Sequence, residues 1–272
     1  MGALLAVREL NVSFDTREGE VRAVDGASFE VRAGECLGVV GESGSGKTQM
    51  FLAVLGLLAR NGRARGRAEF EGIELLGCTE RERNRVRGAR LAMVFQDPMS
   101  SLTPHRRIGA QIAEVLTTHQ GATRAEAERR ALELLERVQV SDAARRLRQY
   151  PHELSGGMRQ RVMIAITLAC APSLIILDEP TTALDVTIQA QLLALFRELK
   201  RELNTAFVLI THDLGVIAGL ADRVVVMNAG RIVEEAAVTE LFRRPRHAYS
   251  EALLRATPRL DQPLAEQAMG PR

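Results

Sequence analysis

The sequence contains one glycine-rich segment of the form G-x-x-x-x-G-K-[ST], which reads Gly41-Glu42-Ser43-Gly44-Ser45-Gly46-Lys47-Thr48. It follows an apolar run that predicts a strand, Cys36–Val40, and precedes a stretch that predicts a helix over about residues 48–58. The glycines let backbone N–H groups turn toward a polyphosphate, and the positive end of the helix adds to the attraction. We expect Lys47 to contact the β- and γ-phosphates of a nucleotide and the Thr48 hydroxyl to bind Mg²⁺. The predicted nucleotide-binding residues of this segment are Gly41, Glu42, Ser43, Gly44, Ser45, Gly46, Lys47, Thr48 and Gln49.

Lysine is rare in this chain, which makes its place in the segment informative. Of the 36 basic residues only Lys47 and Lys200 are lysines. A slender ammonium fits beneath a row of phosphates, whereas the broad planar guanidinium of arginine does not. The lysine therefore favours a phosphate-binding loop over a glycine-rich turn that matches the pattern by chance.

Composition excludes several classes of protein. With 272 residues, 46% of them hydrophobic, the chain can form one large domain or two small ones. A net charge of +2 argues against a dedicated nucleic-acid binder. No stretch reaches the ~18 apolar residues that a bilayer span requires, and no signal peptide is predicted. The cysteines Cys36, Cys78 and Cys170 are scattered and predicted to be reduced core residues, so we expect a cytoplasmic protein.

Strand and helix patterns alternate along most of the chain. Strands are predicted within residues 3–40 and near 67–70, 91–95, 174–177, 207–210 and 224–227. Helical spacing dominates residues 97–170. This order predicts an α/β protein with a mostly parallel core sheet, an N-terminal antiparallel β subdomain and a helical insert. We expect one domain over residues 1–260, with the insert at 97–170, and a disordered tail at 261–272.

Two acidic residues end the predicted strand at 174–177. Ligands of α/β sheets gather at the carboxyl ends of strands, so Asp178 and Glu179 are expected to face the glycine-rich loop. Asp178 is then placed to hold Mg²⁺, directly or through water. Glu179 is placed to accept a proton from the water that attacks the γ-phosphate, or to orient that water. Together with the glycine-rich loop, the pair predicts hydrolysis of ATP. The alternative is that the two acids only end a strand.

The segment before this strand narrows the class. It reads Leu154-Ser155-Gly156-Gly157-Met158-Arg159-Gln160-Arg161 and resembles the signature motif of the ABC transporter ATPases. With it, the chain from about residue 5 to 260 resembles that family. Ser155 and the N–H groups of Gly156 and Gly157 open a predicted helix and make a second anion-binding end, although in isolation they would be an ordinary helix cap. Two γ-phosphate sites in one chain indicate that the signature serves a nucleotide held by another chain.

Four more positions resemble functional positions of the family. Gln96 resembles the glutamine that reports the γ-phosphate and Mg²⁺ to the helical insert, and His212 resembles the switch histidine that contacts the γ-phosphate. Asp185, in Ala183-Leu184-Asp185, resembles the loop that crosses the dimer interface. Phe14 lies where the family places an aromatic ring against adenine, and a core role is the alternative. The resemblance implies ATP and Mg²⁺ as cofactors, with the metal near Thr48, Gln96 and Asp178, and a catalytic set of Glu179, His212 and Gln96.

The residues at the positions of these motifs resemble most closely those of the ATPases of oligopeptide, dipeptide and nickel importers. The segments that carry the closer resemblance are 41–47, 95–102 and 180–186. Positions from Pro245 to Pro258 resemble that family's C-terminal extension, and an amphipathic helix that closes the domain is the alternative. Met158 stands where most ABC ATPases carry glutamine, which in this family implies a heterodimer. No cysteine follows Cys170, so the iron–sulfur cluster of longer relatives is not expected.

The resemblance implies an ATPase that powers import of peptides, or of a related solute such as nickel, at the cytoplasmic face of the inner membrane. The implied partners are a second ABC ATPase subunit, two transmembrane permease subunits and, indirectly, an extracytoplasmic solute-binding protein, without nucleic acid. The alternatives are an ATPase of another ABC transporter class and a non-transport ABC ATPase. A DNA-repair type would carry a coiled-coil insert or zinc cysteines, and a translation type would carry two ATPase cassettes in one chain.

Overall fold

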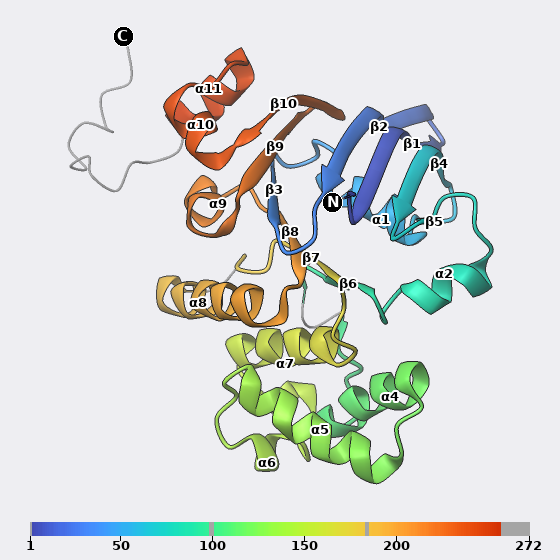
Figure 1. The fold of residues 1–272 in the computed structure, drawn as a ribbon, viewed down its shortest axis with the longest axis vertical. Helices are drawn as coiled ribbons and strands as arrows, with labels where there is room; N and C mark the ends of the chain where they lie inside the picture. The colour runs from blue at the N-terminus through green and yellow to red at the C-terminus, as the bar shows by residue number, and fades with distance from the viewer. Residues whose placement is uncertain (1, 98–100, 183–184, 257–272) are drawn as a thin grey trace.

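The computed structural model describes residues 2–97, 101–182 and 185–256, which form two β-sheets and the helices around them (Figure 1). The smaller sheet is antiparallel and has the strand order β2-β1-β4-β5. Its strands are β1 (Leu5–Thr16), β2 (Gly19–Val31), β4 (Gly62–Phe70) and β5 (Ile73–Glu74). The expected N-terminal antiparallel unit is therefore present.

The larger sheet has the strand order β10-β9-β3-β8-β7-β6. Its strands are β3 (Cys36–Val40), β6 (Leu91–Val94), β7 (Leu174–Asp178), β8 (Ala206–Ile210), β9 (Arg223–Asn228) and β10 (Arg231–Ala237). The five strands from β9 to β6 are parallel, and β10 joins the edge antiparallel. The strands β3, β7 and β8 are buried at every residue, which explains why they are continuous apolar runs in the sequence.

Two hydrophobic cores lie on the two faces of this sheet, because alternate side chains of a strand point to opposite faces. On β3, Cys36 and Val40 belong to one core, whereas Leu37 and Val39 belong to the other. The first core is shared with α7 (Gly156–Leu168), α8 (Val186–Leu203), α9 (Leu214–Leu220) and α10 (Val238–Arg243). The second is shared with the antiparallel sheet and α1 (Lys47–Leu55).

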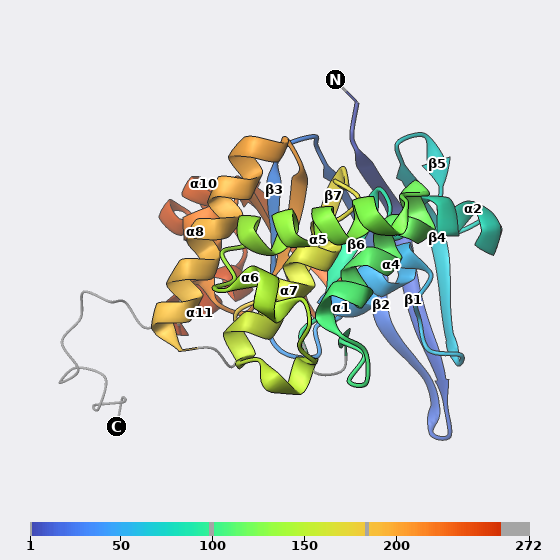
Figure 2. The ribbon, with the colours of Figure 1, turned by 90° about the horizontal axis from the view of Figure 1, so that it is seen from below.

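A group of helices between β6 and β7 lies at one end of the molecule (Figure 1). It consists of α4 (Ile108–Gln120), α5 (Arg124–Arg137), α6 (Ala143–Arg146), the 3-10 helix η1 (Pro151–Glu153) and α7. Seen from below, these helices lie in front of the sheets (Figure 2). Helix α5 begins where Thr123 and Glu126 cap each other's backbone N–H groups, and it buries Ala127, Ala131 and Leu135. The limits 97 and 170 of a separate insert stay a prediction.

Two further helices within the described ranges are α2 (Glu80–Val86) and α11 (Ala248–Ala256). Three details differ from expectation. Helix α1 ends at Leu55, three residues early, because Gly56 adopts a left-handed conformation with φ 66°. Strand β10 was not predicted, because its polar edge residues hide the apolar pattern. The three cysteines carry free thiols, but only Cys36 is buried. Across the described ranges no helix is long and apolar enough to span a membrane, and residues 261–272 lie outside those ranges.

Candidate active site

The glycine-rich loop lies between the carboxyl end of β3 and the start of α1, as predicted. The side chain of Lys47 is buried, and its Nζ donates to the carbonyl oxygens of Gly41 and Glu42, both at 2.8 Å. The hydroxyl of Ser45 lies 3.4 Å from the same ammonium. Burial lowers the pKa of Lys47, while the nearby carboxylates of Glu179 and Asp178 act in the opposite direction. The ammonium is thus held by the loop that it would share with phosphates.

Two glycines of the loop are required by close backbone contacts. A Cβ atom at Gly41 would lie 2.1 Å from the carbonyl oxygen of Met227, and a Cβ at Gly46 would lie 2.2 Å from the carbonyl oxygen of Ala23. Both glycines also have positive φ, 153° and 98°. The loop is therefore packed directly against the end of β9 and against β2, whereas Gly44 faces open space.

Four strand ends meet beside this loop. The strands β3, β8, β7 and β6 are parallel neighbours in that order, so their carboxyl ends lie at one edge of the sheet. This edge carries the glycine-rich loop after β3, His212 after β8, Asp178 and Glu179 at the end of β7, and Gln96 after β6. The arrangement brings together residues that are up to 171 positions apart in the chain, from 41 to 212.

Asp178 connects β7 to the start of α1. Its Oδ1 accepts a hydrogen bond of 2.9 Å from the hydroxyl of Thr48. Only 4% of Asp178 is exposed. The pKa of its carboxyl is raised from 3.8 to about 6. Burial is the largest cause, and the charge of Glu179 also raises the pKa, whereas the hydrogen bond from Thr48 and the charge of Lys47 lower it. The hydroxyl and the carboxylate are both hard oxygen ligands suited to Mg²⁺.

The raised pKa predicts a dependence of stability on pH. Between pH 4 and 6 the unfolded chain ionises Asp178 while the folded chain keeps it protonated, so stability falls as pH rises and the cost is complete above about pH 6. A shift of this size corresponds to about 3 kcal/mol. We expect Asp178→Asn, which cannot ionise, to unfold at a higher temperature than the ligand-free wild type at pH 7 and at nearly the same temperature at pH 4. If the difference in melting temperature between Asp178→Asn and the wild type is the same at pH 4 and at pH 7, burial does not shift the pKa of this carboxyl.

Glu179 is held by side chains from three segments. Its Oε2 accepts hydrogen bonds from Gln96 Nε2 at 3.1 Å and from the Thr182 hydroxyl at 2.8 Å. Its Oε1 lies 3.2 Å from Nδ1 of His212. Burial raises the pKa of Glu179, but the hydrogen bonds with Thr182 and His212 and the positive charge of Lys47 outweigh burial and lower it overall. The carboxylate is thus kept ionised at neutral pH, the state that a proton acceptor needs.

The backbone at Glu179 is also unusual. Its φ is 45°, a left-handed conformation that side chains rarely adopt, and its N–H donates to the carbonyl oxygen of Ile210 on β8. Seven other non-glycine residues in the described ranges also have a positive φ, so this conformation does not by itself mark a functional site. Thr182 was not predicted as a site residue, and its only signal in the sequence is that it follows Glu179 by three positions in a turn.

The signature segment opens helix α7. The hydroxyl of Ser155 accepts from the N–H of Met158 at 3.4 Å, and Gly156 is exposed with open space at its Cβ position. A Cβ at Gly157 would lie 3.1 Å from Ile188 on α8. These contacts stay within α7 and α8, and the Lys47 ammonium, whose contacts are with its own loop, takes no part in them. These contacts of the helix start and the hydrogen bonds of Lys47 with the phosphate loop therefore have no residue in common.

Helix α8 contacts both α7, which the signature segment opens, and Asp213, the residue after His212. The guanidinium of Arg161 on α7 donates to Oε1 of Gln191 at 3.1 Å, and Gln189 Nε2 donates to Asp213 at 3.2 Å. Asp185 caps the start of α8 by accepting from the N–H of Ile188 at 2.9 Å. Helix α8 therefore lies between α7 and the segment that follows β8 and is hydrogen-bonded to both. Ala183 and Leu184 lie outside the described residues.

Phe14 lies on β1, away from the hydrogen bonds that join the other candidate residues. Its ring is half-buried and packs against the core that β1, β2 and α1 share. This packing is compatible with the core role that the sequence left open. Contact with adenine remains a prediction.

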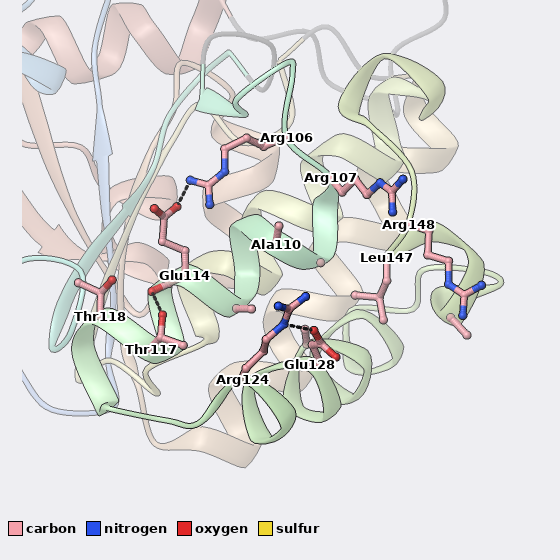
Figure 3. A pocket seen from close by; sticks show the side chains of 14 residues that line it. Arg106, Arg107, Ala110, Glu114, Thr117, Thr118, Arg124, Glu128, Leu147 and Arg148 are labelled. Carbon is pink, nitrogen blue, oxygen red and sulfur yellow. Dashed lines mark hydrogen bonds and ion pairs between the residues drawn. The ribbon is translucent and has the colours of Figure 1, made fainter.

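A separate hollow of ≈ 830 Å³ lies among the helices α4, α5 and α6 (Figure 3). Two of its four arginines are paired with carboxylates: Arg106 with Glu114, and Arg124 with Glu128 at 3.0 Å. None of the strand-end residues lines it. The hollow is therefore separate from the sheet edge that carries Lys47 and Glu179.

The sheet edge, its phosphate loop and the acids at the end of β7 define a phosphate-loop nucleoside triphosphatase. Comparison with known proteins narrows this class: residues 24–182 match the model of the family described as ABC transporter. The chain belongs to the ABC transporter family. The predictions of the fold class and of an ATPase are confirmed by this match and by the sheet topology.

The relatives in this family include subunits of peptide transporters. Residues 233–270 match the model described as oligopeptide/dipeptide transporter, C-terminal region. The oligopeptide transport ATP-binding protein OppD of Salmonella typhimurium is 54% identical over 263 residues, which are 97% of this chain and 78% of that protein. The dipeptide transport ATP-binding protein DppD of Escherichia coli is 50% identical over 261 residues, 96% of this chain and 80% of that protein.

The fold also matches solved ATP-binding cassettes. A dimeric cassette in a post-hydrolysis state bound to ADP and Pi superposes with a TM-score of 0.77, at 26% identity, over 86% of this chain and 98% of that one. The resemblance to the peptide importer ATPases that the motifs predicted is therefore confirmed at the level of family. The role of each site residue remains a prediction.

Proposed function

We propose that this chain is the ATP-hydrolysing subunit of an importer for di- or oligopeptides, or for a related solute such as nickel, bound to the cytoplasmic face of the inner membrane. The observation that carries the ATPase part is the Glu179 carboxylate, held by Gln96, Thr182 and His212 beside the phosphate loop. The peptide part is supported by the printed names of relatives at 50–54% identity and by the match of the C-terminal region.

MgATP is expected to bind through Lys47, Thr48, Gln96 and Asp178. In the part of the chain that the structure describes, no cluster of three or more His, Cys, Asp or Glu could hold a metal alone. This fits Mg²⁺, which takes one or two carboxylates and completes its shell with phosphates and water. The ion would neutralise charge on the phosphates. Lys47 would bind their oxygens, Asp178 and Thr48 would hold the metal, and Glu179 would accept the proton of the attacking water.

The signature is expected to act on the nucleotide of a second ATPase subunit. Ser155, Gly156 and Gly157 offer a hydroxyl proton and backbone N–H groups at the positive end of α7, and no hydrogen bond found among the described residues joins them to the strand-end site of the same chain. Two subunits facing each other would each supply what the other lacks. Met158 in place of glutamine supports a heterodimer with a related ATPase.

The permease subunits are expected to dock beside Gln96. A hollow of ≈ 190 Å³ there has a mostly apolar lining that includes Leu57, Phe95 and Ile166. Leu57 and Phe95 are 39% and 36% exposed, which is unusual for large apolar side chains of this protein. A permease segment that fills this hollow would sense movement of Gln96, one residue from Phe95. A solute-binding protein would act only through the permease.

Co-purification from membranes tests the proposal. We expect tagged Glu179→Gln protein, loaded with MgATP, to retain a second related ATPase and two polytopic membrane proteins whose solute is a peptide or nickel. Recovery of a homodimer, of partners that carry another solute, or of no membrane protein would reject the importer proposal and favour another ABC class.

A charge in the apolar hollow separates docking from dimerisation. Leu57→Glu in the same tagged protein is expected to lose the two membrane proteins and to keep the second ATPase. The matched control is Val21→Glu, because Val21 is also an exposed apolar residue, at 53%, but lies on the β1–β2 hairpin. Equal recovery of the membrane proteins with both variants would show that the permease docks elsewhere.

A further inference from the structure

The C-terminal helix reaches the phosphate loop. The hydroxyl of Tyr249, on α11, accepts a hydrogen bond of 3.0 Å from the backbone N–H of Glu42. The two residues are 207 positions apart in the chain. Tyr249 lies in the region that matches the C-terminal model of peptide transporters, residues 233–270. The model of the ABC transporter family matches residues 24–182. Tyr249 lies outside this range and yet contacts the glycine-rich loop.

The contacted peptide unit is the one that also holds Lys47. The carbonyl of Gly41 and the N–H of Glu42 belong to the same peptide, and this carbonyl accepts from Lys47 Nζ at 2.8 Å. The next carbonyl, that of Glu42, accepts from the same ammonium at 2.8 Å. Hydrogen bonds at both ends of one peptide polarise it in the same sense and restrict its rotation. Tyr249 thus fixes the orientation of the group that places the ammonium.

Tyr249 is itself held in place by a buried acid. Glu234, on β10 and only 7% exposed, accepts from the backbone N–H groups of Arg246 at 2.9 Å and His247 at 3.0 Å. Nδ1 of His247 accepts from the N–H of Tyr249 at 3.1 Å. Tyr249, Leu253 and Leu254 pack against the core beneath α11. The hydroxyl is therefore presented to the loop from a rigid support beside β10 (Figure 1).

We propose that Tyr249 is a positioning residue of the nucleotide site, which fixes the Gly41–Glu42 peptide and through it the Lys47 ammonium. It would not touch the nucleotide. Without the hydroxyl, the N–H of Glu42 would bond to mobile water and the peptide could rotate, so that part of the phosphate-binding energy would be used to order the loop. The C-terminal region and the nucleotide are then coupled: a change at α11 alters ATP affinity, and bound ATP stabilises α11.

The test is MgATP binding to the full-length chain with Tyr249→Phe, which removes only the oxygen atom. One neutral hydrogen bond corresponds to about a fivefold weaker affinity for MgATP. In the assembled transporter, KM for ATP is expected to rise by a similar factor while kcat stays within about twofold, because Glu179 and its partners are untouched. The melting temperature of the ligand-free chain should stay within about 2 °C of wild type.

Two controls separate positioning from a structural role. Tyr150→Phe removes the same atom from the other tyrosine of the chain, and we expect no change in affinity. Leu253→Ala loosens the packing of α11 but keeps the hydroxyl, and we expect a lower melting temperature with a smaller change in affinity than in Tyr249→Phe. An affinity of Tyr249→Phe equal to wild type would overturn the proposal. A higher affinity would also overturn it, because the tyrosine would then compete with phosphate for the N–H of Glu42.

The proposal depends on the nucleotide site and not on the transported solute. Wild-type binding of MgATP in the same titration verifies the site itself. Failure of the peptide-importer proposal would leave the effect of Tyr249→Phe unchanged.

Discussion

A Glu179→Gln variant is expected to hydrolyse ATP about a thousandfold more slowly than wild type in the assembled transporter, with MgATP affinity within about twofold. The amide has the same shape as the carboxylate and can still accept hydrogen bonds from Gln96 and Thr182. It cannot take up a proton from water. The loss should therefore fall on kcat and leave KM almost unchanged.

Steady-state hydrolysis and equilibrium binding, measured on the same preparation, check this result. A matched control is Glu202→Gln, since Glu202 is another carboxylate, paired with Arg137 at the surface and remote from the loop. Its kcat should equal that of wild type. Retention of most of the activity by Glu179→Gln would show that another group accepts the proton.

The hydrogen bonds around Glu179 also predict that replacing one of its partners lowers activity less than replacing Glu179 itself. Gln96, Thr182 and His212 each make one contact with the carboxylate, and each comes from a different segment. Loss of any one leaves two in place and leaves the proton acceptor itself intact. We therefore expect the loss of the carboxylate to cost more activity than the loss of any one of its three partners.

The parts of this site that could be predicted are those that a short segment encodes. A strand, a glycine-rich turn and a helix are adjacent in the sequence, so Lys47 and Thr48 could be placed with respect to phosphates before any fold was known. Asp178 and Glu179 could be placed because parallel strands share one ligand edge. His212 lies after β8, next to β7 in the sheet, but the sequence indicated a role for it only through the resemblance to the family.

The parts that could not be predicted depend on contacts between distant segments. Tyr249 meets Glu42 across 207 positions, and no local pattern at either residue indicates the contact. In the sequence, Glu234 looks like an ordinary exposed acid of an edge strand. Its burial could not be predicted, because the N–H groups that donate to its carboxylate lie twelve and thirteen residues later in the chain. Thr182 differs, because it contacts Glu179 only three positions away, through the turn after β7. For Tyr249 and Glu234 the contact with a distant segment, and not the residue type, is what the sequence did not indicate.

Lys47→Arg is expected to weaken MgATP binding about a hundredfold, although it conserves the charge. The ammonium lies in a site that leaves the residue 6% exposed, with carbonyl oxygens at 2.8 Å on two sides and the Ser45 hydroxyl at 3.4 Å. A planar guanidinium carries three nitrogen atoms and cannot fit this geometry without moving the loop. Loss of charge-assisted contacts with phosphate corresponds to about two orders of magnitude in affinity.

The composition of the chain supplies the control, because it contains only one other lysine. Lys200 pairs with Asp222 at 2.6 Å on the surface of α8, where either cation can bond to the carboxylate. Lys200→Arg should therefore bind MgATP as wild type does in the same titration. If Lys47→Arg also binds as wild type does, the site accepts any cation and the rarity of lysine in this chain has no bearing on phosphate binding. If only position 47 is sensitive, the compact charge of lysine is required at that position, whereas arginine suffices at position 200.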